Sequence, residues 1–314
     1  MDSSSAVEPP REAREDGSRA RRLTVIFNPV AGLGRRRRYV EALRHLDELG
    51  CRLDVRETGG PGDAGVFASE AAEGGCDRVV VAGGDGTINE AVNGLAGAGV
   101  PLAILPLGTA NVLAAEIGLD LDPRAIAETI VGGVARPVCL GRVRGSAGGS
   151  GLFSLMLGAG FDAHVVAGVN LKLKRLAGKG AYVAESLRQL AAFRFPRYRV
   201  VVDGTAYEAA SVVVAKAHYY GGRYIVAPDA RLDQPRFHVC LFQRGGPLSA
   251  VRYALALQLG RLPTLSDYRI VTGTQVRIDG PAGDPVQADG DVIAHLPVEI
   301  EIVPDALSLV VPAR

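Results

Sequence analysis

The sequence predicts an α/β fold followed by a β-rich one. In residues 21–135, short β-branched runs alternate with helix-like stretches, which is typical of a parallel sheet with helices on both faces. Three of these runs end in glycine-rich turns that also carry Asn, Asp or Thr. From residue 136 onward, apolar runs follow one another through short turns, as antiparallel strands do. We therefore expect a doubly wound N-terminal domain (21–135) and a separate antiparallel domain (136–314), preceded by a leader (1–20).

The elements of the first domain follow from their periodicity and their end signals. Runs rich in Val and Ile predict strands, and apolar residues three or four apart, such as Val40 and Leu43, predict helices. The predicted strands are 23–27, 52–58, 78–82 and 102–105, and the predicted helices are 39–49, 63–73, 87–95 and 109–117. Asp63 is expected to be the N-cap of its helix, and Asp122 with Pro123 should begin a further helix.

In the second domain, turn residues separate the apolar runs. The segment "GSAGGS" (145–150) lies between two such runs and predicts a hairpin, and Asp203 with Gly204 predicts another. Helical stretches are expected between residues 163 and 195 and over 248–259. The later predicted strands are 236–242, 268–280, 298–303 and 307–311.

The composition is that of a globular protein, and it excludes several classes. The 314 residues are 47% apolar and 22% charged, and 35 basic residues balance 34 acidic ones, so no nucleic-acid partner is expected. Four cysteines without a C-x-x-C pair indicate buried thiols rather than disulfides or zinc ligands. The leader lacks an apolar core and is expected to be disordered. Pro101 and Pro106 interrupt the uncharged stretch 91–115, so we expect a soluble, cytoplasmic protein.

Three glycine turns form the first candidate site. The segments "IFNPVAG", "VVAGGDGTIN" and "ILPLGTAN" each follow a predicted strand, and the carboxyl ends of parallel strands meet at one edge of a sheet. Their N–H groups, and the helix N-termini behind them, favour an anion. Any one of them could be an ordinary βα turn, but three with the same polar residues favour a ligand. A dinucleotide fingerprint and a Walker A loop both fail, because Arg37 replaces a glycine and no Ser or Thr follows Lys179.

These segments carry a family resemblance. "FNPVAG", "GGDGTINEAVNGL" and "LPLGTANVLA" resemble the diacylglycerol kinase catalytic-domain family, in particular the bacterial lipid kinases. The resemblance continues in order through "LKRLAGKGAYV", "YYGGRYIVAPDARLD" and "ADGD", and sphingosine kinases and NAD kinases share the GGDG core. It implies a nucleotide domain of phosphofructokinase and NAD kinase-like topology, a β-sandwich lipid-binding domain, an active site between them, and ATP and Mg²⁺ as cofactors.

The resemblance also implies a nucleotide site. Asp85 would reach Mg²⁺ directly or through water, which explains a carboxylate inside a phosphate turn; the alternative is a turn or helix-cap role. Thr58 is either a nucleotide contact or a strand-end cap. The implied nucleotide-binding residues are Asn28, Pro29, Val30, Ala31, Gly32, Thr58, Gly83, Gly84, Asp85, Gly86, Thr87, Ile88, Asn89 and Thr109.

A second acidic element, "QADGDV", is implied to supply the proton acceptor. Asp291 fits this role, with Asp289 and Asp85 as competitors, and the alternative for the element is an ordinary Asp-Gly hairpin turn. Asp233 lies where bacterial relatives bind a second Mg²⁺, but Gln234 and the proline after it replace a carboxylate and a glycine there.

The function expected from this resemblance is an ATP-dependent lipid kinase that phosphorylates a lipid hydroxyl to give a phospholipid such as phosphatidic acid. The alternatives are a kinase of a soluble acceptor, as NAD kinases are, and a non-catalytic nucleotide- or lipid-binding module. The arginine run 35–38 is either a solvated helix start or a contact for phosphates or lipid headgroups. The basic, leucine-containing segment 171–179 is either an amphipathic helix or an edge for transient attachment to the inner membrane face. The sequence leaves the oligomeric state open, with a homodimer as one option.

Overall fold

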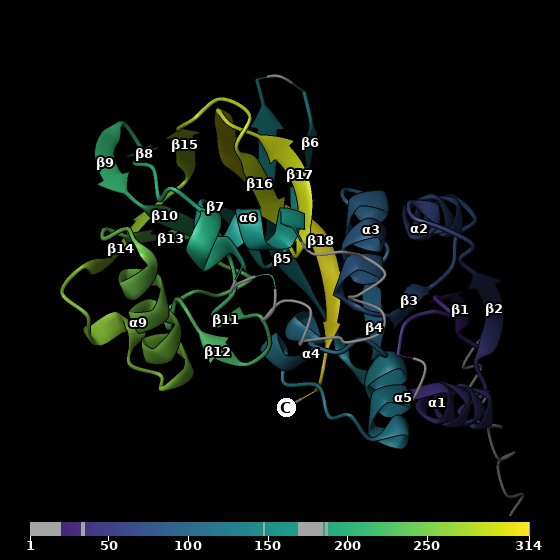
Figure 1. The fold of residues 1–314 in the computed structure, drawn as a ribbon. Helices are drawn as coiled ribbons and strands as arrows, with labels where there is room; N and C mark the ends of the chain where they lie inside the picture. Colours follow the sequence, from purple (N-terminus) through teal and green to yellow (C-terminus); the bar gives the residue numbers. More distant parts are fainter. Residues whose placement is uncertain (1–19, 33–34, 147, 169–184, 186–187, 314) are drawn as a thin grey trace, which may run out of the picture.

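A computed structural model describes residues 20–32, 35–146, 148–168, 185 and 188–313. All of the predicted leader except Ala20, and the whole basic segment 171–179, lie outside these residues. Within the described residues, one large sheet runs through the whole molecule, a second sheet packs against part of it, and two short strands form a separate hairpin (Figure 1).

The first domain is a parallel sheet between two pairs of helices, as predicted. Strand β1 pairs with β2 and β3, and β3 pairs with β4, all in parallel. Helix α1 packs against α5 and helix α2 against α3, on opposite faces of the sheet (Figure 1). The elements are β1 (Arg22–Phe27), α1 (Arg36–Glu48), β2 (Arg52–Glu57), α2 (Asp63–Glu73), β3 (Arg78–Gly83), α3 (Asp85–Leu95), β4 (Leu102–Pro106), α4 (Val112–Glu116) and α5 (Pro123–Gly132).

The helix ends follow local signals, with one correction. Asp122 is the N-cap of α5 and Pro123 its first residue, as predicted. Asp63 is not the N-cap of α2: Gly62 occupies that position with φ 91°, a left-handed conformation that glycine adopts without strain. The Asp63 carboxylate instead accepts the N–H groups of two glycines that precede the helix.

The second domain is a β-sandwich, also as predicted. Its second sheet has the strand order β14-β13-β10-β7-β16-β17, and the core between the two sheets includes Phe153, Tyr198 and Phe237. Asp203 and Gly204 form the predicted turn between β8 and β9. The elements are β5 (Val134–Gly145), β6 (Ser150–Phe153), β7 (Met156–Ala159), α6 (Phe161–Gly168), β8 (Tyr198–Val202), β9 (Thr205–Ala209), β10 (Ser211–Ala215), β11 (Tyr219–Tyr220), β12 (Tyr224–Ile225), β13 (Phe237–Phe242), α9 (Pro247–Gln258), η2 (Leu262–Thr264), β14 (Tyr268–Gly273), β15 (Gln275–Asp279), β16 (Pro285–Ala288), β17 (Asp291–His295) and β18 (Val298–Val311).

The two halves are not structurally separate, which corrects one expectation. Strand β18 pairs with β5 along its length and, at Leu309, with β4 of the first domain, so the large sheet crosses the predicted boundary. The predicted strands 298–303 and 307–311 are one strand with an irregularity in its register. The predicted strand 268–280 divides at Thr274 into β14 and β15, which lie in different sheets.

The uncharged stretch 91–115 is divided among α3, β4 and α4, as its prolines predicted. Most of its residues are buried, because β4 is an interior strand of the sheet and both helices pack against the domain. Among the residues that the structure describes, none of the helices combines the length and the apolar character that a bilayer-spanning segment needs.

Candidate active site

The three predicted turns meet at the carboxyl end of the parallel strands. They are turn 1 (28–32) after β1, turn 2 (83–87) after β3 and turn 3 (106–111) after β4. The N–H of Asn28 donates to the carbonyl of Ala82 at 3.0 Å, and the N–H of Leu107 donates to the carbonyl of Gly83 at 2.8 Å. The side-chain amide of Asn28 also donates to the hydroxyl of Thr87 at 2.8 Å. These bonds join the turns into one continuous surface.

Glycines allow the turns to touch. A Cβ added to Gly108 would lie 2.6 Å from the Cα of Gly84, and a Cβ added to Gly84 would lie 3.3 Å from the Cα of Gly108. Gly32 approaches turn 3 in the same way, since a Cβ there would lie 2.0 Å from the carbonyl oxygen of Leu107. Any side chain at these positions would push the backbones apart. The shape of the surface therefore depends on these glycines.

Asp85, in the first turn of α3, connects turn 2 to turn 3. Its Oδ2 accepts the N–H of Asn111 at 2.9 Å, and its Oδ1 accepts the N–H of Val112 at 2.7 Å. Burial raises the pKa of the Asp85 carboxyl, and the backbone N–H donors partly oppose this. Gly84, not Asp85, is the N-cap of α3, so the carboxylate serves α4 instead. Each oxygen of a carboxylate has a second lone pair, which leaves it able to accept from a further partner.

Asn111 is a candidate site residue that the sequence analysis did not select. It is buried, it has a left-handed backbone (φ 48°), and within the described residues its Oδ1 has no hydrogen-bond partner. A buried amide oxygen without a partner costs about 1–3 kcal/mol, so such an atom is typical of a ligand contact. Asn111 ends the segment "LPLGTAN", and this position in a glycine turn could have identified it as a site residue. The predicted helix 109–117 instead placed it inside a helix, whereas α4 begins only at Val112.

The second acidic element is a tight turn in which Asp289 has a structural contact. Asp289 and Gly290, at φ 48° and 94°, connect β16 to β17. The Asp289 carboxylate accepts the hydroxyl and the N–H of Ser154 and the N–H groups of the next two residues, at 2.8–3.1 Å. Burial raises the pKa of Asp289 to about 6, although these donors lower it. The carboxylate thus fixes the turn against the segment between β6 and β7.

Asp291, the first residue of β17, projects toward turn 2. Its Oδ2 lies 3.4 Å from the position that a Cβ on Gly86 would occupy. A carboxylate of the second domain therefore faces the glycine turn of the first domain. The element is an Asp-Gly hairpin turn and, at the same time, a part of the candidate site.

Two side chains that the sequence analysis did not select hold the domains in this arrangement. Asn93 of α3 exchanges two hydrogen bonds with the backbone of Leu152 in β6, at 3.0 Å from its Nδ2 and 2.9 Å to its Oδ1. The carboxylate of Glu116 in α4 contacts Nδ1 of His218, just before β11, at 2.7 Å. Asn93 is part of the motif "NEAVNGL", whereas nothing in the local sequence pairs Glu116 with a residue 102 positions away.

The remaining residues that the family resemblance implies for nucleotide binding differ in burial and in their place in the fold. The side chain of Ile88 is only 2% exposed and packs in the core. Thr58 is buried at the end of β2, where its N–H donates to the carbonyl of Phe27 at 2.9 Å. Val30 and Thr109 are exposed in turns 1 and 3. Pro29 and Ala31 lie in turn 1, and Asn89 lies in α3.

The arginine run 35–38 is divided between solvent and the candidate site. Arg35 donates to the carbonyl of Leu107 at 3.0 Å, and Arg38 donates to the carbonyl of Pro106 at 3.1 Å, so both brace turn 3. Arg37 is exposed and pairs with a glutamate one helical turn further along α1. Arg35 and Arg38 therefore contact turn 3, whereas Arg37 faces solvent, and a role of the run in binding an anion stays a prediction.

Beside Asp233, the structure has a buried lysine. Lys216 is 0% exposed, and its ammonium donates to three backbone carbonyls between residues 231 and 236. Burial lowers the pKa of Lys216 to about 8, while Cys139 and Asp233 oppose that shift. Among the residues that can be described, no three His, Cys, Asp or Glu side chains are grouped to hold a metal ion. A metal-binding role for Asp233 stays a prediction.

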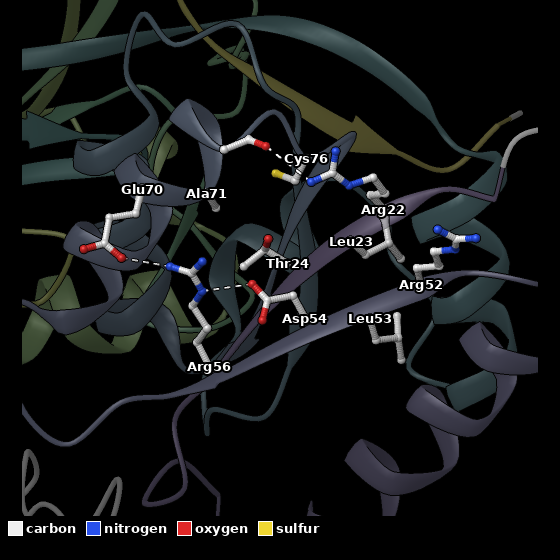
Figure 2. A pocket seen from close by; sticks show the side chains of 11 residues that line it. Arg22, Leu23, Thr24, Arg52, Leu53, Asp54, Arg56, Glu70, Ala71 and Cys76 are labelled. Atoms are coloured by element: carbon white, nitrogen blue, oxygen red, sulfur yellow. Dashed lines mark hydrogen bonds and ion pairs between the residues drawn. The ribbon is translucent and has the colours of Figure 1, made fainter.

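A surface groove at the edge of the first domain is unrelated to this site. It is lined by the first residues of β1 and β2 and by α2, and in it Arg56 pairs with Asp54 at 3.0 Å and with Glu70 at 2.8 Å (Figure 2). None of the predicted site residues lines it. Most of its strand residues, 22–24 and 52–54, lie in the first halves of β1 and β2, whereas the turns of the candidate site follow the carboxyl ends of strands.

Comparison with known proteins identifies the family. The family model "Diacylglycerol kinase catalytic domain" matches residues 22–143, and the model "YegS C-terminal NAD kinase beta sandwich-like domain" matches residues 156–311. A diacylglycerol kinase of Mycobacterium tuberculosis is 30% identical over 298 residues, which cover 93% of this chain and 95% of that protein. The chain belongs to the diacylglycerol kinase catalytic-domain family. A diacylglycerol kinase of Bacillus subtilis is 29% identical over 89% of this chain and 92% of its own length.

The fold of the family is confirmed by a solved structure. A crystal structure described as a diacylglycerol kinase of Bacillus anthracis superposes with a TM-score of 0.74, at 24% identity, over 92% of this chain and 96% of that one. As a member of the diacylglycerol kinase catalytic-domain family, the chain is a kinase of the lipid kinase type, and membership implies that ATP is the phosphoryl donor.

Proposed function

We propose that this kinase transfers the γ-phosphoryl group of ATP to the hydroxyl of a lipid such as a diacylglycerol, giving a phospholipid such as phosphatidic acid. The observation that carries the proposal is the approach of Asp291 to Gly86, with 3.4 Å between its Oδ2 and the position of a Cβ on that glycine. Phosphoryl transfer to an alcohol needs a base at the hydroxyl and a cradle for the phosphates. A carboxylate facing a glycine turn supplies both.

The nucleotide would lie on the surface of the three turns. Gly84 and Gly108 carry no side chain that would keep phosphates away from the backbone N–H groups of turns 2 and 3, and the helices that start behind these turns favour the charge of the phosphates. Mg²⁺ fits this site, because Mg²⁺ on phosphates needs only one or two protein oxygens. The carboxylate of Asp85 is present, and so is the Oδ1 of Asn111, which has no hydrogen-bond partner among the described residues. When bound, the ion would neutralise charge on the phosphates.

Asp291 would accept the proton of the lipid hydroxyl while the oxygen of that hydroxyl attacks the γ-phosphorus of ATP. The new oxygen–phosphorus bond forms while the bond to the bridging oxygen of ATP breaks, and ADP leaves. Asp289 would keep the turn in place through its four hydrogen bonds, and Asn93 would hold α3 against the second domain. We also propose a cytoplasmic protein that attaches transiently to the inner membrane face, where a lipid acceptor lies.

The test is a radiolabelled ATP assay against a lipid panel in mixed micelles. We expect Asp291→Asn to lower kcat about 100- to 10,000-fold, because a general base typically contributes that much, with ATP affinity and thermal unfolding unchanged. Asp47→Asn, at an exposed position of α1, is the matched control and should behave as wild type. Full activity of Asp291→Asn would move the base elsewhere.

Two other outcomes would replace the proposal. The second family model is named for a NAD kinase-like sandwich, so NAD is a sensible soluble acceptor to include in the panel. Phosphorylation of NAD without any dependence on micelles would assign a soluble acceptor. ATP binding without phosphoryl transfer to any acceptor would assign a non-catalytic module.

A further inference from the structure

Helix α9 has an unusual exposed face. Helices on a protein surface normally turn polar residues to water and apolar residues to the core. In α9, Tyr253 and Ala256 face the core, while Leu248 (87% exposed), Leu255 (54%) and Leu259 (69%), the residue after the helix, face outward. Val251, at 42%, lies on the same side, because these residues are three or four positions apart.

The strand β12 extends this apolar surface. Tyr224 and Ile225 are 39% and 38% exposed, and β12 contacts α9 (Figure 1). We call this surface the α9 face; its members are Tyr224, Ile225, Leu248, Val251, Leu255 and Leu259. The other strand of the hairpin, β11, contacts α4, whose Glu116 binds His218 at the junction of the two domains. The α9 face thus belongs to the surface next to the domain junction.

The charges around the α9 face are mostly positive. Residues 236–266 include four arginines and no Asp or Glu, and Arg223 precedes Tyr224. Arg244 and Arg252 retain 72% and 42% exposure of their side chains although both pair with Asp267. Arg223 and Arg261 are also exposed. An apolar stripe bordered by arginines is complementary to a surface that is apolar inside and negative outside.

We infer that the α9 face docks on an anionic lipid bilayer, with its leucines among the acyl chains and its arginines at the headgroups. A second copy of this chain fits less well. A twofold contact would place the same arginines opposite one another, and Asp267, the carboxylate that follows α9, is nearly buried and already pairs with Arg244 and Arg252 of its own chain. The inference rests on the proposed function in one respect, since a lipid acceptor explains why such a surface is needed.

The experiment uses the absence of tryptophan from the chain, so that one introduced indole reports on one position. We expect the emission of Leu255→Trp to shift to shorter wavelength, and to be quenched by brominated lipid, on vesicles that contain phosphatidylglycerol. Val66→Trp, 55% exposed on α2, is the control and should show neither effect. Leu248→Gln/Leu255→Gln should bind these vesicles at least about tenfold more weakly than wild type, because two leucines that would insert among the acyl chains are lost.

A control pair and a charge pair complete the design. Leu49→Gln/Val66→Gln removes two exposed aliphatic side chains from the first domain and should bind as wild type. Arg223→Gln/Arg261→Gln should lose about fivefold in binding for each arginine, on anionic vesicles only.

The inference is overturned if the emission of Leu255→Trp does not respond to vesicles, or if Leu248→Gln/Leu255→Gln binds them as wild type does. It is also overturned if this double variant instead converts a dimer to a monomer in light scattering, since the α9 face would then be a subunit interface. Binding is measured without ATP. Lipid kinase activity in mixed micelles is tested separately. Absence of this activity would therefore contradict the proposed function without contradicting vesicle binding by the α9 face.

Discussion

Gly108→Ala should disable the candidate site without unfolding the protein. The added Cβ would lie 2.6 Å from the Cα of Gly84 and 2.9 Å from Oδ1 of Asn111. Ordinary contacts begin at 3.4 Å, and the first obstacle is backbone that cannot rotate away, so turns 2 and 3 must separate by roughly 0.8 Å. Overpacking of this kind costs about 1–3 kcal/mol of unfolding free energy. A displacement of about 1 Å at a reacting centre costs roughly 100-fold in rate.

Two other glycines provide a graded series. A Cβ on Gly84 would lie 3.3 Å from the Cα of Gly108, which requires a shift of only about 0.1 Å, so Gly84→Ala should lose less than about tenfold in rate. Gly132 is the last residue of α5, and no atom of the described residues lies within 4 Å of a Cβ added there, so Gly132→Ala should be neutral or slightly stabilising.

The assay is kcat/KM for ATP, with ATP affinity by calorimetry and unfolding by circular dichroism for each variant. We expect kcat/KM to be highest in Gly132→Ala, lower in Gly84→Ala and lowest in Gly108→Ala. Wild-type activity in Gly108→Ala would refute the reasoning, since the contact of the two turns would then have no part in binding phosphates. Loss of activity that only parallels loss of folded protein would refute it as well.

Three further predictions concern a carboxylate, a buried lysine and an interdomain contact. Burial raises the pKa of the Asp85 carboxyl above the ordinary aspartate value of about 4, so Asp85 should become protonated at a higher pH than an ordinary aspartate does. If the reaction needs ionised Asp85, kcat/KM should fall on acidification at a pH above that ordinary value. A fall in kcat/KM only below that pH would argue against an ionised Asp85 in the reaction. Lys216→Met leaves three carbonyls without their donor and should lower the free energy of unfolding by about 2–4 kcal/mol in urea, whereas an unchanged midpoint would mean that water replaces the ammonium. Asn93→Ala loses both hydrogen bonds to Leu152 and should cost about 1–3 kcal/mol in calorimetry. The comparison is Asn89→Ala, which removes a 3.4 Å hydrogen bond between the Asn93 and Asn89 side chains but leaves both bonds to Leu152 in place.

Local sequence patterns predicted much of the fold. The alternation of strands and helices in the first domain, the Asp122-Pro123 helix start and the hairpin at Asp203 were predicted, because each depends on residues within a few positions of one another. The convergence of the three turns was also predictable, since parallel strands bring their carboxyl ends to one edge. The cap of α2 was predicted wrongly because Gly62 and Asp63 both carry start signals, and only the backbone conformation chooses between them.

What only the tertiary structure decided concerns partners far apart in the chain. The sequence by itself determined which turns and carboxylates the site could use. It did not determine that β18 returns to β4, that Asp291 faces Gly86, or that Asp289 accepts the backbone N–H groups of residues 154–156. These contacts join residues more than 100 positions apart, so they depend on strand register and sheet order, which no local pattern encodes. The same holds for the α9 face: helical spacing is visible in the sequence, but which side of the helix remains in water is fixed by what packs against the other.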